Sequence, residues 1–97
     1  MRVSLDGDGR VAVVEQAVEA CAFGQASAAL VGAGAVGLNR DEAEAVLRRV
    51  EQWLGGVGDE PWPRMAVFEP ARARRGRHGA ILLPFRALVA AIARASD

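Results

Sequence analysis

Residues 20–39 form a run of twenty residues without a charged side chain. A run of this length can cross a membrane if it is strongly apolar. Four glycines, Gln25 and Ser27 dilute this one, so its insertion into a bilayer would be weakly favourable at best. The run therefore predicts a buried helix of small residues, and we expect no membrane association.

The length of the chain, 97 residues, predicts one domain over residues 1–97. Its single cysteine excludes an intramolecular disulfide and a metal cage made only of cysteines from one chain. No basic stretch followed by an apolar stretch marks a secretory signal. We therefore expect a cytoplasmic location, where thiols stay reduced.

The first twenty residues predict a β-hairpin. Val3 and Leu5 alternate with polar residues, residues 6–9 have the sequence Asp-Gly-Asp-Gly, and valines follow this turn. An isolated hairpin is marginally stable in water, so it must pack on helices or gain a strand from another chain.

Residues 39–54 give the clearest helical pattern. Asn39 with Glu42 resembles a capping box, and apolar residues follow at helical spacing until Gly55 and Gly56. Residues 55–64 are expected to form a loop. With the helix predicted after residue 20 and one at the C-terminus, the fold class is α+β. It is a small antiparallel sheet packed against three to four helices.

The C-terminal helix is predicted to begin near Pro84, because proline is favoured in a first helical turn and breaks a helix interior. Residues 72–82 are then irregular or extended. This prediction places Arg77, His78 and Gly79 in the loop that leads into the last helix.

The formal net charge is zero, but residues 70–97 carry six arginines and one acid. Four of these arginines lie at positions 72, 74, 75 and 77. Such a run can attract phosphate or an acidic partner, or it can be a solvated loop. No aromatic residues lie between the arginines, and no second basic face is evident, so we expect no nucleic-acid binding.

Residues 32–37 match the pattern G-x-G-x-x-G, which in dinucleotide-binding proteins follows a strand and opens a helix. Here the next helix is capped by Asn39, after the pattern has ended, and the chain is too short for the remaining sheet. The glycines are better interpreted as the end of one helix and a turn.

Two residues could carry chemistry. Cys21 lies between the second strand and the small-residue helix, where the positive end of the helix dipole lowers the pKa of a thiol. His78 follows the arginine run. Each is also compatible with a plain structural role, Cys21 as a small core residue and His78 as a surface residue.

Residues 21–28 (CAFGQASA) resemble the middle-cysteine motif of the NifU/IscU-type iron–sulfur cluster assembly scaffolds, in which a cysteine precedes a small-residue helix with an Ala-Ser pair. Residues 77–82 (RHGAIL) look like the third-cysteine motif of that family. The order of elements is similar over nearly the whole chain. Cys21 matches the middle cysteine, and His78 matches the histidine before the third.

The chain departs from the family at three points. The first-cysteine motif would lie upstream of Met1, Gly79 stands where the third cysteine is expected, and the Leu-Pro-Pro-Val-Lys chaperone motif is absent. A further strand of the family would also lie upstream. Its lack leaves a sheet edge that can recruit other chains. We therefore expect a homo-oligomer or heteromer, or a true N-terminus upstream of Met1.

The resemblance implies an accessory or degenerate scaffold, not an enzyme, that binds iron or a cluster or accepts sulfur through Cys21. Its cofactor would be an iron–sulfur cluster or an iron or zinc ion, with Cys21 and His78 as ligands. A cluster normally has four protein ligands, so one chain is incomplete and a symmetric dimer could supply Cys₂His₂. Implied partners are a cysteine desulfurase and recipient apoproteins.

Two alternatives stay open. The chain could be a structural or protein-interaction domain that keeps the scaffold fold without binding a cluster. It could also be a small thiol enzyme using Cys21 and His78, although no acid or oxyanion device is evident near either residue in the sequence.

Overall fold

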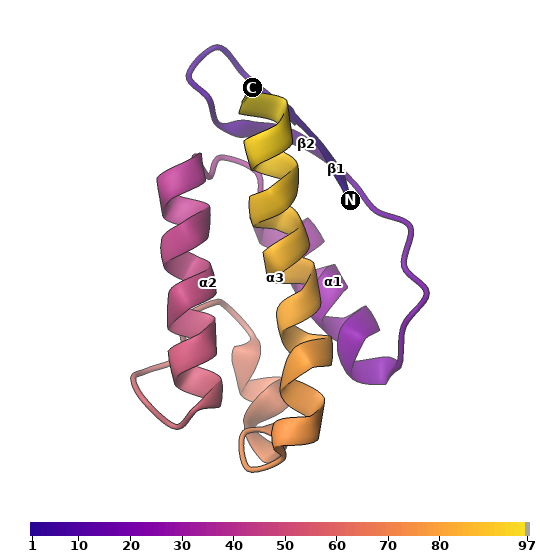
Figure 1. The fold of residues 1–97 in the computed structure, drawn as a ribbon, viewed down its shortest axis with the longest axis vertical. Coiled ribbons are helices and arrows are strands. Elements are labelled where there is room, and N and C mark those ends of the chain that lie inside the picture. The colour runs from indigo at the N-terminus through magenta and orange to yellow at the C-terminus, as the bar shows by residue number, and fades with distance from the viewer. Residues whose placement is uncertain (97) are drawn as a thin grey trace.

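The computed structural model describes residues 1–96 and shows an α+β fold in which a two-stranded antiparallel sheet packs against helices (Figure 1). The predicted fold class is confirmed. The elements in chain order are β1 (Arg2–Leu5), β2 (Val11–Glu15), α1 (Ala22–Gly34), α2 (Arg40–Leu54), the 3₁₀ helix η1 (Met65–Ala71) and α3 (Arg75–Ser96).

The hairpin forms where the sequence predicts it, because its turn is stabilised by local interactions. The Asp6 carboxylate accepts hydrogen bonds from the backbone amides of Asp8 at 2.9 Å and Arg10 at 3.0 Å. Gly9 adopts a φ of 75°, which a glycine tolerates without strain. These contacts need no tertiary partner, so the turn could be read from the sequence.

The N-terminus of α2 is also as predicted. The Asn39 side chain accepts a hydrogen bond from the Glu42 amide at 2.8 Å, and the Glu42 carboxylate accepts one from the Asn39 amide at 3.1 Å. This is a complete capping box. Just before it, Gly37 has a φ of 95° and lies in the turn after α1, as the turn interpretation of residues 32–37 predicts.

The predicted start of the last helix is wrong. The helix α3 begins at Arg75, so Arg77, His78 and Gly79 lie in its first turns and not in a loop. Pro84 lies in the helix interior, where proline costs about 3 kcal/mol. Burial of Ile81 and Leu82, which precede this proline, offsets the local cost.

The helix α3 is the centre of the core. In Figure 1 it runs along the length of the molecule between α2 and α1, with the hairpin near its C-terminal end and η1 near its N-terminal end. Its buried side chains include Ile81, Phe85, Leu88 and Ile92. By length and composition α3 could also cross a membrane, a test that core helices of soluble proteins pass as well.

A buried hydrogen bond fixes α1 against α3. Ser27 is fully buried, and its hydroxyl donates to the Ile81 carbonyl over 2.6 Å. The small residues of α1 allow this close approach, because they hold its backbone near the partner helix. As a result the N-terminal end of α1, with Cys21, is held beside the start of α3, with Arg77.

Candidate functional site

Cys21 is the N-cap residue of α1 and is exposed. Its backbone is extended, with φ −67° and ψ 173°, as is usual at this position. Its side chain makes no capping hydrogen bond to the described residues, and the first turn of α1 holds no acidic residue. The positive end of the helix therefore faces the thiol without a competing carboxylate.

This environment favours the thiolate. The backbone amide of Gly24 lowers the pKa of the Cys21 thiol below its ordinary value of 9.0, and the Phe23 amide and the charge of Arg77 act in the same direction. Desolvation of the thiol, the second-largest influence on its pKa, opposes them. A thiolate is the nucleophilic and metal-binding form of cysteine, so the lowered pKa increases the fraction of Cys21 in that form at a given pH.

Arg77 reaches this site from α3. Its guanidinium carbon lies 6.0 Å from the centroid of the Phe23 ring, in the first turn of α1. This is the outer limit of a cation–π contact, and it holds the positive charge near the start of α1. Arg77 is thus the arginine of the basic run that the structure brings to Cys21.

Arg72, which directly follows η1, has a different role from the other arginines of the run. It donates to the Trp53 carbonyl at 2.7 Å, lies 4.6 Å from the Trp53 ring centroid and pairs with Glu69 at 3.1 Å. These contacts tie η1 to the end of α2. Arg72 is therefore a packing residue, whereas Arg74, Arg75 and Arg77 are exposed.

His78 lies in α3 and is bonded to backbone. Its Nε2 is 3.1 Å from the Ala71 carbonyl and 3.0 Å from the Arg72 carbonyl. Both partners are acceptors, so Nε2 must carry a proton and donate to them. The ring ties the end of η1 to α3, and its Nε2 is not free to bind a metal in this arrangement.

The donor set of one chain does not fit a cluster or a zinc ion. Within residues 1–96, no three His, Cys, Asp or Glu side chains gather to hold a metal. Over the same residues no hydrogen bond joins Cys21 and His78. Of these two residues, Cys21 lines the cavity described in the next paragraph and His78 does not. One chain offers the Cys21 thiolate and a His78 ring whose Nε2 is already bonded to carbonyls. This set falls short of the four ligands that a cluster or a zinc ion requires.

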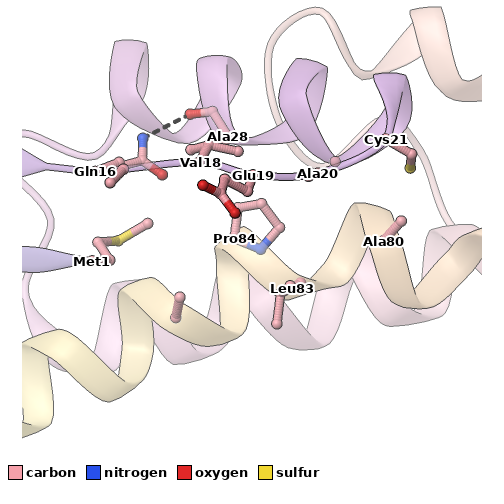
Figure 2. Close-up of a pocket in the computed structure, with 13 residues that line it drawn as sticks. Met1, Gln16, Val18, Glu19, Ala20, Cys21, Ala28, Ala80, Leu83 and Pro84 are labelled. Carbon is pink, nitrogen blue, oxygen red and sulfur yellow. Dashed lines mark hydrogen bonds between the residues drawn. The ribbon is translucent and has the colours of Figure 1, made fainter.

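A cavity of about 330 Å³ lies beside Cys21, between the segment after β2 and the helices α1 and α3 (Figure 2). Figure 2 shows Cys21 at one end and Met1 at the other, with Leu83 and Pro84 in the α3 wall. Most lining residues are small and apolar, and Gln16 bonds the Ala28 carbonyl at 2.9 Å. The sequence pattern did not predict this cavity, although the alanines on the segments that face it are the signal from which it could have been inferred.

Gly79, at the position of the family's third cysteine, lies in α3 and is exposed. A Cβ atom added there would meet nothing within 4 Å. A side chain at this position is therefore sterically permitted, so the glycine is not required by packing.

Comparisons with protein-family models, with curated proteins and with solved structures find no match for this chain.

Proposed function

We propose that this chain is an accessory protein of iron–sulfur cluster assembly that accepts sulfur on Cys21. The observation that carries the proposal is the exposed thiol at the uncapped start of α1, with its pKa lowered by the Gly24 amide and by Arg77. The resemblance of residues 21–28 and 77–82 to the NifU/IscU-type scaffolds supplies the context. In this role the chain is an acceptor and not an enzyme.

The chemistry is a transfer of sulfane sulfur between thiols. The Cys21 thiolate attacks the terminal sulfur of a persulfide on the donor, a new S–S bond forms, and the donor thiolate leaves. The step has no net oxidation, and Cys21 becomes a persulfide. The positive charge of Arg77 stabilises both the attacking thiolate and the anionic product.

The donor would be a cysteine desulfurase, and a recipient apoprotein would take the sulfur onward. Both reactions suit the reducing cytoplasm. Iron, zinc or cluster binding through Cys21 and His78 is a narrower version of the proposal. It requires donors from a second chain, and His78 would bind through Nδ1 while Nε2 stays bonded to its two carbonyls.

The test uses the one thiol of the chain. The protein is incubated without oxygen with a cysteine desulfurase and cysteine, and separately with a small-molecule persulfide, and its intact mass is measured. We expect the mass to rise by one sulfur atom in the wild-type protein and to stay constant in Cys21→Ser. A wild-type protein that gains no sulfur from either donor would refute the proposal.

The metal-binding version is tested with Gly79→Cys, which places a second thiol where a side chain fits. Titration with Co²⁺ reports thiolate ligation by visible absorption. We expect weak binding in the wild-type protein and tighter binding in Gly79→Cys. Equal spectra for the wild type and Cys21→Ser would remove Cys21 as a metal ligand.

The second candidate function, a protein-interaction domain without a ligand, is favoured by the occupied His78 ring. A protein that takes up neither sulfur nor Co²⁺ but is stably folded would support it.

A further inference from the structure

The helix α3 carries four arginines and no acidic residue along its 22 residues. It is also the longest helix of the fold, and in Figure 1 it lies in front of the other elements. One side of α3 carries a row of exposed residues at helical spacing, which we call the basic strip. The basic strip consists of Arg75, Gly79, Leu83, Arg86 and Ala90.

The arginines of the basic strip have no partner among residues 1–96, as is true of most arginines in this chain, whereas a few are paired. Arg10 pairs with Glu42 at 2.7 Å, and Arg40 pairs with Glu44 at 3.4 Å. By contrast, Arg75 and Arg86 form no ion pair and no side-chain hydrogen bond with any residue in 1–96. Their charge is unbalanced within the described part of the chain and is free for a partner.

We propose that the basic strip docks an acidic helical segment of another protein. Arg75 and Arg86 are eleven positions apart, or about 16 Å along the helix axis. Carboxylates at the same spacing on a parallel or antiparallel helix would meet both guanidinium groups, which bind carboxylates in bidentate geometry. Between them, Gly79 lets the partner backbone approach closely.

Leu83 supplies the apolar centre of the proposed contact. Its side chain is 61% exposed, and it is the leucine among the exposed large apolar side chains of the described residues. Flanking charges with a central apolar anchor are the arrangement of protein–protein contacts, in which a buried centre is surrounded by a polar rim.

Other occupants fit the basic strip less well. The helix α2 of a second copy would fit poorly, because its exposed face mixes Glu51 with Arg48 and Arg49 and would bring like charges together. A membrane surface would find one large apolar side chain, Leu83, on the strip. A nucleic acid would find no aromatic side chain there for base stacking.

The experiment measures binding of a fluorescent helical peptide to the full chain by anisotropy at physiological salt. The peptide carries glutamates at the spacing of Arg75 and Arg86 and leucines between them. We expect saturable binding that weakens about tenfold or more in Arg75→Glu/Arg86→Glu. Leu83→Ala is expected to weaken it about fivefold, because part of a buried leucine is lost.

The matched control is Arg48→Glu/Arg49→Glu, which makes the same charge change on exposed positions of α2. We expect it to leave peptide affinity within about twofold, because rim charges outside a contact act weakly. Circular dichroism melts check that all variants fold.

Three results would overturn the proposal. One is absence of saturable peptide binding. Another is an equal loss in both double variants, which shows only a net-charge effect. The third is tighter binding, through Arg75 and Arg86, of a single-stranded oligonucleotide or of equimolar phosphatidylcholine–phosphatidylserine vesicles. Leu83 also lines the cavity beside Cys21, whereas Arg75 and Arg86 do not, so the charge-reversal variant tests docking apart from sulfur acceptance.

Discussion

At its C-terminal end α1 lies against Trp62, whereas at its N-terminal end it leaves Cys21 open to solvent. The Trp62 indole donates to the Leu30 carbonyl at 3.1 Å and meets the Phe85 ring edge-on at a centroid distance of 5.5 Å. At the other end the Phe23 ring meets the Phe68 ring at a centroid distance of 6.1 Å, and the Gly24 amide faces the exposed Cys21 thiol.

The two ends use small residues for different purposes. Beside Trp62, Gly34 leaves space for an aromatic ring to cover the backbone, which contributes stability. Beside Cys21, the small residues and the absence of acids in the first turn leave the helix dipole to act on the sulfur. One helix therefore separates a stabilising end from a reactive end.

The largest expected effect comes from filling the Trp62 end. In Gly34→Ala the added Cβ would lie 2.5 Å from Cζ2 of Trp62, so the buried ring must shift. We expect the free energy of unfolding to fall by about 1–3 kcal/mol, as in other overpacked sites. Urea unfolding measures this change.

Gly32→Ala is the control in the same helix. Its nearest neighbour is the Gln16 amide nitrogen at 3.2 Å, the end of a side chain that needs to give by only a few tenths of an ångström while it keeps its hydrogen bond to the Ala28 carbonyl. The helix propensity of alanine, worth up to about 1 kcal/mol over glycine, then offsets any loss. If the two variants unfold at the same urea concentration, the contrast between the ends of α1 is wrong.

A cap at the reactive end should stabilise α1 and remove its chemistry. In Cys21→Asp a carboxylate takes the N-cap position, accepts hydrogen bonds from the first-turn amides and meets the helix dipole favourably. We expect a higher unfolding temperature, measured by circular dichroism, together with complete loss of sulfur uptake. An unchanged or lower unfolding temperature would mean that these amides are already satisfied.

A smaller effect is expected from the arginine beside the thiol. The lowered pKa of Cys21 predicts alkylation by iodoacetamide with a pH midpoint below 9.0, hence a faster rate near neutral pH than an ordinary thiol. Arg77→Ala should move the midpoint upward and slow the reaction by about twofold, as loss of one exposed charge would.

Arg74→Ala is the matched control, because Arg74 is exposed but does not act on the Cys21 thiol. High salt should reduce the difference between wild type and Arg77→Ala. Identical rates for the Arg77 and Arg74 variants would show that Arg77 does not reach the sulfur.

The smallest effect concerns α2, whose N-terminus is already capped. The Asn39 amide and Arg10 hold the pKa of the Glu42 carboxyl below its ordinary value of 4.5. Its stabilisation is therefore complete above about pH 4.5 and is lost as the pH falls through the lowered pKa. Glu42→Gln should flatten the acid side of the stability profile below about pH 4.5, where the wild-type carboxyl takes up its proton.

The sequence predicted elements whose signals are local. The Asp6 turn and the Asn39–Glu42 capping box form from residues within a few positions of one another. Both are retained in the fold, where the Arg10–Glu42 ion pair at 2.7 Å joins the end of the hairpin turn to the capping box. The predicted start of α3 was wrong because the rule that proline opens a helix considers only neighbouring residues. The burial of Ile81 and the hydrogen bond from Ser27 to its carbonyl depend instead on segments far apart in the chain.

The candidate site divides in the same way. Placement of Cys21 at a helix N-terminus followed from the order of strand, cysteine and small residues. The hydrogen bonds of His78 to the carbonyls of Ala71 and Arg72 could not be predicted in this way, because η1 was not predicted. The arginine run looked uniform in sequence, yet packing against Trp53 sets Arg72 apart from Arg77.

The sequence by itself determined the hairpin, the two helix N-termini near Cys21 and Asn39, and the concentration of arginines toward the C-terminus. These features depend on backbone propensity and covalent order. The tertiary structure alone decided which arginine meets the thiol, what His78 binds and which face of α3 stays exposed. Such outcomes depend on distances between segments far apart in the chain, which are fixed only when the core around α3 packs.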